Sequence, residues 1–125
     1  MANEVSIQGR VLAVKNGITT DSTAQNLQLT MAGNTAVKNI QTIGTTTEAL
    51  VLGDVATPGY LYLKRATAPT GDTVYISLDT PASSGNAFAT LDAVSKFAIV
   101  PCQQTTIYAK AAATATNIEV LAVSL

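Results

Sequence analysis

Apolar and polar residues alternate along most of this chain, and helical periodicity does not continue for more than a turn or two. Strict alternation places every second side chain on the same face of a β-strand. Turn-forming residues separate the alternating runs, among them Asn16-Gly17, Pro58-Gly59 and Ser84-Gly85-Asn86. Short strands at this spacing are typical of sandwiches and jelly rolls. The pattern therefore predicts an all-β fold, a jelly-roll-like antiparallel β-sandwich.

The alternation also sets the bounds of the expected strands. They are residues 5–8, 10–15, 26–31, 36–43, 48–52, 60–64, 73–78, 87–91, 96–100, 105–111 and 118–124. At Pro58-Gly59 we expect a type II turn, because proline fixes φ at its first central position and glycine accepts the positive φ that follows. A chain of 125 residues is long enough to bury a core as a single domain.

The segment from residue 60 to residue 78 has the clearest alternation. The residues expected to face the core are Leu61, Leu63, Val74, Ile76 and Leu78. The outward positions include Tyr60, Tyr62 and Tyr75, whose rings favour burial while their hydroxyls need water or a partner. These tyrosines belong either to ordinary strand packing or to a contact with another subunit.

Residues 1–25 are expected as an N-terminal arm or an extra strand pair, outside a β-sandwich domain at residues 26–125. The stretch "ITTDSTAQ", residues 18–25, has no pattern and suggests an extended arm or a long loop. We favour an arm that adds hydrogen bonds to a neighbouring sheet edge. Its candidate contact residues are Val5, Ile7, Val11, Leu12 and Val14. In the alternative interpretation, Asn16-Gly17 closes a hairpin within one subunit and these residues form core.

The charge of the chain excludes several classes of partner. Only 12% of the residues are charged and the formal net charge is -1, so neither a nucleic-acid footprint nor a polybasic membrane anchor is expected. No apolar run approaches the length that spans a bilayer, and the opening Met-Ala-Asn-Glu lacks the positive charge of a secretory signal. We expect synthesis and assembly in the cytoplasm. Low surface charge also favours association with other subunits.

Candidate catalytic and metal-binding residues are few. Cys102 is the single cysteine and the chain has no histidine, so a disulfide framework and the commonest zinc ligand are both missing. We expect Cys102 to be a buried or half-buried small hydrophobic residue without reactivity. Four carboxylates lie beside turn residues, where aspartate accepts local backbone hydrogen bonds: Asp54, Asp72, Asp79 and Asp92. Calcium binding by these carboxylates stays open, but the sequence predicts no enzyme, no cofactor and no metal site.

The C-terminal half carries a family resemblance. The stretches "LGDVATPGYLYLKRATAPTGDTVYISLD" and "KFAIVPCQQTTIYAKAAATATNIEVLAVSL" resemble a group of small virion structural proteins of tailed bacteriophages. The shared features are an LGD-x-x-x-PG turn, a strand of the type Y-V-x-I, an apolar strand that ends in proline, and L/I-Y-x-K-A before a final strand; they fall on residues 52–59, 74–78, 97–101 and 107–111, with the final strand at 118–123. The resemblance covers about the last 75 residues. It departs at Arg65-Ala66-Thr67, where members often carry Asn-Leu-Asp.

The resemblance implies a non-enzymatic capsid decoration, or cement, protein. Such a protein binds the outer capsid surface, has the major capsid protein as its partner, and stabilises contacts between shell subunits. A homotrimer at local three-fold positions is the simplest symmetric arrangement for it. The alternatives are a tail or head-fibre component of the virion, and a carbohydrate-binding β-sandwich module that uses Tyr60, Tyr62 or Tyr75 as its sugar platform.

Overall fold

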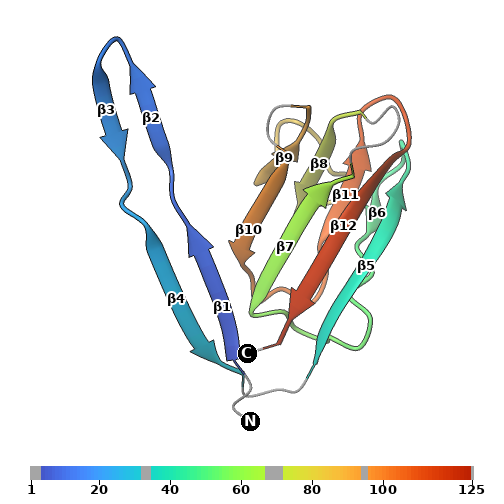
Figure 1. The fold of residues 1–125 in the computed structure, drawn as a ribbon. Coiled ribbons are helices and arrows are strands. Elements are labelled where there is room, and N and C mark those ends of the chain that lie inside the picture. The colour runs from blue at the N-terminus through green and yellow to red at the C-terminus, as the bar shows by residue number, and fades with distance from the viewer. Residues whose placement is uncertain (1–3, 32–34, 67–71, 94–95, 125) are drawn as a thin grey trace. The chain divides into compact units, whose positions relative to one another are not determined.

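The computed structural model describes residues 4–31, 35–66, 72–93 and 96–124 (Figure 1). These residues contain strands and no helix, which confirms the predicted all-β class. The chain divides into two compact units, residues 1–34 and residues 35–124. The first unit is a long hairpin and the second is a sandwich of two sheets.

The sandwich has the strand order of a jelly roll. One sheet has the order β10-β7-β12-β5, and the other has the order β6-β11-β8-β9. The bounds of these strands are β5 (Ala36–Ile43), β6 (Glu48–Ala49), β7 (Tyr60–Arg65), β8 (Val74–Ser77), β9 (Ala89–Leu91), β10 (Phe97–Pro101), β11 (Tyr108–Ala111) and β12 (Thr116–Val123). Within the sandwich the first strand pairs with the last, the second with the next to last, and so inward to β8 with β9, always antiparallel. This nested pairing confirms the expected jelly-roll-like topology.

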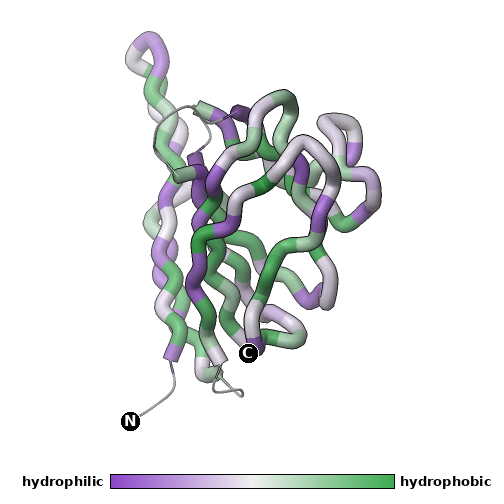
Figure 2. Tube along the Cα trace, turned by 90° about the vertical axis from the view of Figure 1, so that its right-hand side faces the viewer, coloured by the Kyte–Doolittle hydropathy of each residue, from purple (hydrophilic) through white to green (hydrophobic). Residues whose placement is uncertain are grey.

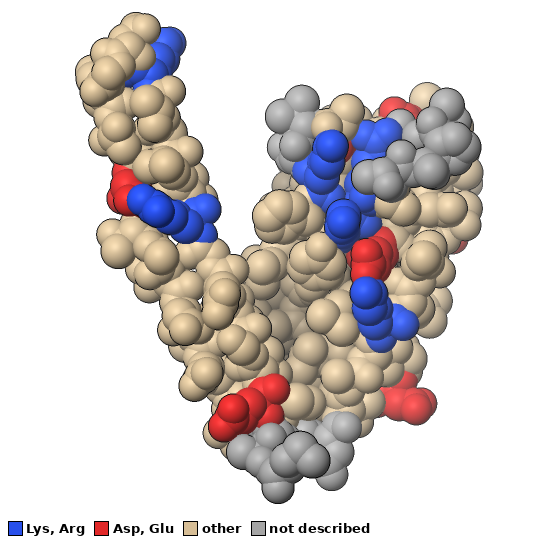
Figure 3. Space-filling model, in the orientation of Figure 1, with Lys and Arg blue, Asp and Glu red and all other residues tan. Residues whose placement is uncertain are grey.

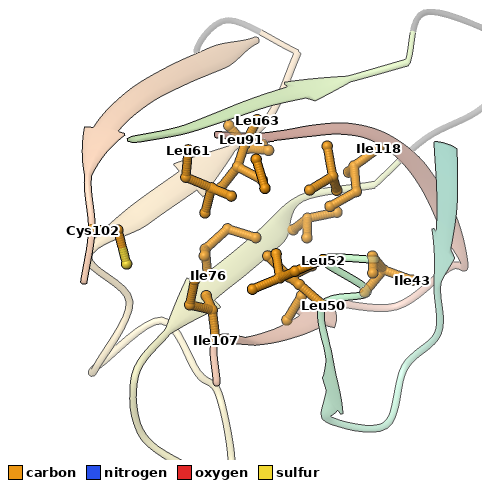
Figure 4. Packing of buried hydrophobic residues seen from close by; sticks show 14 of the residues in the cluster. Ile43, Leu50, Leu52, Leu61, Leu63, Ile76, Leu91, Cys102, Ile107 and Ile118 are labelled. Carbon is orange, nitrogen blue, oxygen red and sulfur yellow. The ribbon is translucent and has the colours of Figure 1, made fainter. Parts of the chain in front are cut away.

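The core lies between the two sheets, because each sheet presents its inward positions to the other. Leu61 and Leu63 on β7 face Ile76 on β8, as the alternation predicted, and all three are fully buried (Figure 4). The other large residues of the cluster are Ile43, Leu50, Leu52, Val55, Val74, Leu91, Ile107, Ile118 and Val120. Figure 2 shows the hydrophobic and hydrophilic residues alternating along these strands. Burial of this apolar surface is the main source of stability.

Leu78 is an exception, and the prediction that it faces the core is wrong. Its side chain is 46% exposed, because β8 ends one residue earlier at Ser77. Ser77 is itself buried: its hydroxyl donates to the carbonyl of Asn86 at 3.1 Å and accepts from the backbone N–H of Asp79 at 3.0 Å. The chain leaves the sheet at this serine, so the alternation no longer determines which side a residue faces.

The expected type II turn at Pro58-Gly59 is also wrong. Gly59 continues the sheet, since its N–H donates to the carbonyl of Val123 at 2.7 Å and its carbonyl accepts from Cys102 at 3.0 Å. Among the described glycines, only Gly17 and Gly53 have positive φ. The residue with a left-handed backbone conformation in the bend before β7 is therefore Gly53, with φ of 58°.

Gly53 leads to a first testable prediction. A Cβ atom at this position would lie 2.9 Å and 3.0 Å from the two Cγ atoms of Val37, in a backbone conformation that L-residues rarely adopt. We expect Gly53→Ala to lower the free energy of unfolding by about 1–2 kcal/mol from the left-handed backbone, and further from the clash. Urea titration measures the loss. Gly44→Ala is the matched control, since nothing lies within 4 Å of its Cβ position; an equal loss in both variants would contradict the explanation.

The N-terminal unit is one long antiparallel hairpin. Its strands are β1 (Glu4–Gly9), β2 (Leu12–Lys15), β3 (Ile18–Asp21) and β4 (Gln25–Thr30), with β2 paired to β3 and β1 paired to β4. The turn at Asn16-Gly17 has φ of 52° and 78°, as a type I′ hairpin turn requires. This is the hairpin of the alternative interpretation, but Val11, Leu12 and Val14 are exposed and do not form core as that interpretation expected.

The hairpin changes two boundaries that were expected from the sequence. Residues 18–21 form a strand, so the view of residues 18–25 as a patternless arm or loop is wrong there. Residues 26–30 pair with β1 and belong to the hairpin, whereas they were expected as the first strand of the sandwich. The boundary between the units accordingly falls between residues 34 and 35 and not after residue 25.

Candidate interaction surfaces

The lower half of the hairpin, formed by β1 and β4 and called here the hairpin base, has one apolar face. Val5 lies opposite Leu29 and Ile7 lies opposite Leu27, so all four side chains share that face. The residues between them are polar and share the other face: Glu4, Ser6, Gln8, Asn26, Gln28 and Thr30. The structure thus brings the predicted contact residues Val5 and Ile7 together on an amphipathic ribbon.

The upper half, residues 10–22 with β2 and β3, is called here the hairpin tip, and both of its faces carry exposed apolar residues. The predicted contact residues Val11, Leu12 and Val14 are 72%, 51% and 64% exposed, and Ile18 is 70% exposed. Leu12 and Val14 lie on one face of the β2–β3 ladder, whereas Ile18 lies on the other face, opposite Lys15. Ile18 was not predicted as a contact residue, because it stands in the segment that showed no alternation.

A β-bulge joins the base to the tip. Three residues, Ser22 to Ala24, lie between the two ladders on one strand, opposite two, Arg10 and Val11, on the other. The Val11 N–H donates to the Ser22 hydroxyl at 2.8 Å, and the Ser22 N–H donates back to the Val11 carbonyl at 2.9 Å. The bulge therefore keeps hydrogen bonds across the ribbon while it shifts the register by one residue.

Asp21 holds the bulged strand in place. The Arg10 guanidinium donates from Nε to Oδ1 at 2.9 Å and from Nη2 to Oδ2 at 2.6 Å, and the Thr23 N–H donates to Oδ1 at 2.9 Å. Arg10 first, and the Thr23 N–H second, lower the pKa of Asp21. Thr23 has φ of 63°, a left-handed conformation that this local bond supports. Because the ion pair is exposed, it fixes the local geometry but adds little to the free energy of unfolding.

The outer face of the first sheet carries apolar side chains over β10 and β7, with Lys64 of β7 opposite Phe97. Tyr60 and Tyr62 on β7 point away from the core, next to Phe97 and Ile99 on β10. The rings of Tyr62 and Phe97 lie 6.3 Å apart between centroids, and Phe97 and Ile99 are 61% and 40% exposed. We call these four residues the outer apolar patch.

The rest of this outer face, over β12 and β5, is more polar. Lys38 pairs with Glu119 at 2.6 Å, and the Thr42 hydroxyl donates to the side-chain oxygen of Asn117 at 2.6 Å. On the face that Figure 3 shows, most of the described surface is uncharged, and Lys and Arg gather toward one end of the sandwich. Apolar side chains continue onto these two strands, because Leu121 on β12 lies opposite Tyr62 and Ile40 on β5 is 70% exposed.

Tyr75 does not join the other two tyrosines. It lies on β8 in the second sheet, between Val74 and Ile76, which point into the core. Its neighbours across the strands are Lys110 and Thr90. Tyr75 points away from the core as expected, but it does not share a face with Tyr60 and Tyr62, because the jelly roll places β7 and β8 in opposite sheets.

Asp72 has the turn role that the sequence predicted. Its Oδ1 accepts from the Thr73 N–H at 2.8 Å, and its Oδ2 accepts from the N–H groups of Ala113 and Thr114, the latter at 3.0 Å. These three N–H groups, Thr73 first, lower the pKa of the carboxyl. The carboxylate thereby links the segment before β8 to the turn between β11 and β12.

Asp72 makes stability depend on pH. Since the folded state lowers its pKa, the carboxylate stabilises the fold above pH ~4, and this contribution is lost as the pH falls through the folded pKa. We expect Asp72→Asn to lower the Tm at pH 7 and to make the Tm fall less steeply between pH ~5 and pH ~2. Thermal unfolding monitored by circular dichroism across this range measures both effects. Asp79→Asn, in the exposed turn after β8, should retain the wild-type slope; the same flattening there would contradict the assignment.

The described residues contain few groups suited to catalysis or metal binding. Cys102 is buried in the core cluster, as predicted, and the chain has no histidine to act as its base. Within the ranges that the structure covers, no three His, Cys, Asp or Glu side chains gather into a metal site. No helix in those ranges is long and apolar enough to span a membrane. No protein-family model, curated protein or solved structure matches the chain.

Proposed function

We propose that this protein is a non-enzymatic virion structural protein of the capsid decoration type. In this role it binds the outer surface of a capsid, with the major capsid protein as its partner, and stabilises contacts between shell subunits. It acts as a homo-oligomer, with a trimer at local three-fold positions as the simplest symmetric way to present three contact patches. The family resemblance of residues 52–123 supplies the virion context.

The exposed apolar hairpin tip is the observation that carries the proposal. Val11, Leu12, Val14 and Ile18 are all more than half exposed on a narrow ribbon. Single exposed apolar residues are common on monomers, whereas several of them close together on one short segment mark an interaction site. A chain with net charge -1 has little electrostatic repulsion to oppose such association.

The proposed mechanism is the use of several weak contacts at once. Complete burial of one of these side chains stabilises a contact by about 1–2 kcal/mol, whereas association of two free molecules costs at least ~4 kcal/mol. One patch therefore binds weakly, but an oligomer that engages several patches together binds with much higher avidity. Besides the hairpin tip and the outer apolar patch, the sandwich offers Leu78 and Phe88, which are 46% and 42% exposed near the end of β8.

Binding to capsid shells tests the proposal. We expect the purified protein to bind shells stripped of decoration, and to occur in virions in a copy number close to that of the shell protein. A much lower copy number would indicate a tail or head-fibre component. A glycan array tests the third possibility, a carbohydrate-binding module. Selective sugar binding without shell binding would contradict the structural role.

A further inference from the structure

The turn at the end of the hairpin tip, Asn16-Gly17, has a reactive sequence. The side-chain amide of an asparagine can be attacked by the backbone nitrogen of the next residue, and glycine hinders this attack least because it has no Cβ atom. Asn16 is the only asparagine of the chain that glycine follows. Both residues are exposed, and nothing lies within 4 Å of the Cβ position of Gly17. No side chain therefore crowds the bond that joins them.

Strand pairing leaves this dipeptide outside the ladder. The last pair of the β2–β3 ladder is Lys15 with Ile18, so Asn16 and Gly17 form the two-residue loop between the strands. Their φ values of 52° and 78° are those of a type I′ turn. This turn fixes the backbone of Asn16, whereas attack on its side chain requires rotation about its Cα–C bond. The reaction therefore starts from an opened turn.

The surroundings of the turn permit such opening. Every residue of β2 and β3 is exposed, and a two-stranded ribbon is at best marginally stable in water. Segments with few buried contacts open locally while the rest of a protein stays folded. Separation of the last ladder pair, Lys15 with Ile18, is enough to release the turn.

The other asparagines of the described ranges lack this combination of features. The side chains of Asn39, Asn86 and Asn117 are held by hydrogen bonds, respectively to the carbonyl of Val51, to the carbonyl of Pro81 and from the hydroxyl of Thr42. Asn26 lies within β4, paired with β1. Each of these four asparagines is followed by a residue with a Cβ atom. Sequence and structure together therefore single out Asn16.

We propose that Asn16 is a site of spontaneous deamidation, and that its isoaspartate product opens the hairpin tip. The Gly17 backbone nitrogen loses its proton to water and bonds to Cγ of Asn16, and the side-chain nitrogen leaves as ammonia after it takes up a proton. Water then opens the five-membered imide at one of its two carbonyls, which yields aspartate or isoaspartate. Water is the only co-reactant, and nothing is oxidised or reduced.

The isoaspartate product cannot retain the turn. It adds a methylene group to the backbone between residues 16 and 17, whereas a type I′ turn fits two ordinary residues with positive φ. The β2–β3 ladder thereby loses the turn that closes it. Below the tip, the Arg10–Asp21 ion pair and the β1–β4 ladder do not involve the turn, so we expect the change to end at the bulge.

Ageing of the purified protein at mildly alkaline pH tests the site. Peptide mapping by mass spectrometry locates each deamidated residue, and labelling with a protein isoaspartate methyltransferase measures the isoaspartate. We expect Asn16 to react before Asn26, Asn39, Asn86 and Asn117, and to react faster as the pH rises, because the deprotonated nitrogen attacks. Asn16→Gly is the matched control: Gly-Gly also favours a type I′ turn, but it has no side-chain amide, so the labelling should be lost.

Two-dimensional NMR tests the effect on the tip. The aged wild-type protein should lose the cross-strand contacts between β2 and β3, such as that of Val14 with Thr19, and should keep those between β1 and β4. The aged Asn16→Gly variant should keep both sets.

Three results would overturn the inference: an Asn16 that reacts no faster than the other four asparagines, labelling that persists in Asn16→Gly, and an intact β2–β3 ladder in the isoaspartate form. Because the experiment uses the free protein and no capsid shell, its outcome does not depend on the proposed function.

Discussion

Leu63→Ala is expected to lower the free energy of unfolding by about 2–5 kcal/mol, because it removes a fully buried side chain and leaves a cavity between the two sheets. For a unit the size of the sandwich, residues 35–124, this corresponds to a fall in Tm of at least ~8 °C. Differential scanning calorimetry measures it. Leu63 has 0% exposure on β7, with Ile76 of the opposite sheet in the same cluster (Figure 4).

Two controls separate loss of packing from loss of an apolar residue as such. Ile40→Ala changes a side chain on β5 of the same sheet that is 70% exposed, and should alter stability by no more than about 0.5 kcal/mol. Leu63→Met keeps the volume and should cost less than about 1.5 kcal/mol. Equal losses for Leu63→Ala and Ile40→Ala would mean that the core does not lie between these sheets.

Removal of residues 2–34 is expected to leave a folded sandwich that no longer associates. The buried core cluster runs from Ile43 to Ala122, so the deletion takes no residue from it. Among the described strands, those of the hairpin pair only with one another, so no sheet of the sandwich loses a strand. We expect a Tm within a few degrees of wild type, together with a monomeric state and weakened binding to capsid shells.

A shortened hairpin is the matched control for this deletion. Gly9 lies opposite Gln25 at the end of the β1–β4 ladder, so an Asn-Gly turn in place of residues 10–24 removes the tip and retains the base. This variant should lose the oligomer as the full deletion does. Deletion of residues 2–25 is a poorer design, because it leaves β4 without β1 and exposes an unpaired strand edge. A fall in Tm of more than ~10 °C on removal of residues 2–34 would show that hairpin and sandwich unfold as one unit.

The strongest sequence predictions concern alternation within single strands. Leu61, Leu63, Val74 and Ile76 face the core as expected, since period-2 alternation is a local property of the extended chain. The prediction that Leu78 faces the core fails, because the Ser77 hydroxyl donates to the carbonyl of Asn86, a residue of the following turn. A strand end fixed by such a tertiary contact leaves little mark in the sequence.

Residues 18–21 show how pairing can override a weak pattern. Their alternation is poor, but Asn16-Gly17 folds them back against β2, and the bulge at residues 22–24 restores a ladder farther along the chain. The one-residue shift of register interrupts the apolar–polar alternation along this strand. The turn dipeptide was the available signal for this strand.

The candidate surfaces were only partly predictable. Val11, Leu12 and Val14 were identified as contact residues from their strand-like spacing, and they are exposed on the hairpin tip. The outer apolar patch was half identified, through Tyr60 and Tyr62, whereas Phe97 and Ile99 join them only because β10 pairs with β7. These two segments are more than thirty residues apart in the sequence, so no local pattern relates them.

The sequence by itself determined the all-β class, the core-facing positions Leu61, Leu63, Val74 and Ile76, the turn role of Asp72 and the burial of Cys102. These properties depend on the chemistry of a residue and its near neighbours. The tertiary structure alone decided that residues 1–34 form a separate hairpin, that Tyr75 lies in the opposite sheet from Tyr62, and that Gly59 continues a ladder. Backbone N–H and C=O groups are the same at nearly every position, so they accept any strand as a partner. The choice among partners follows from closing one common core around distant segments of the chain.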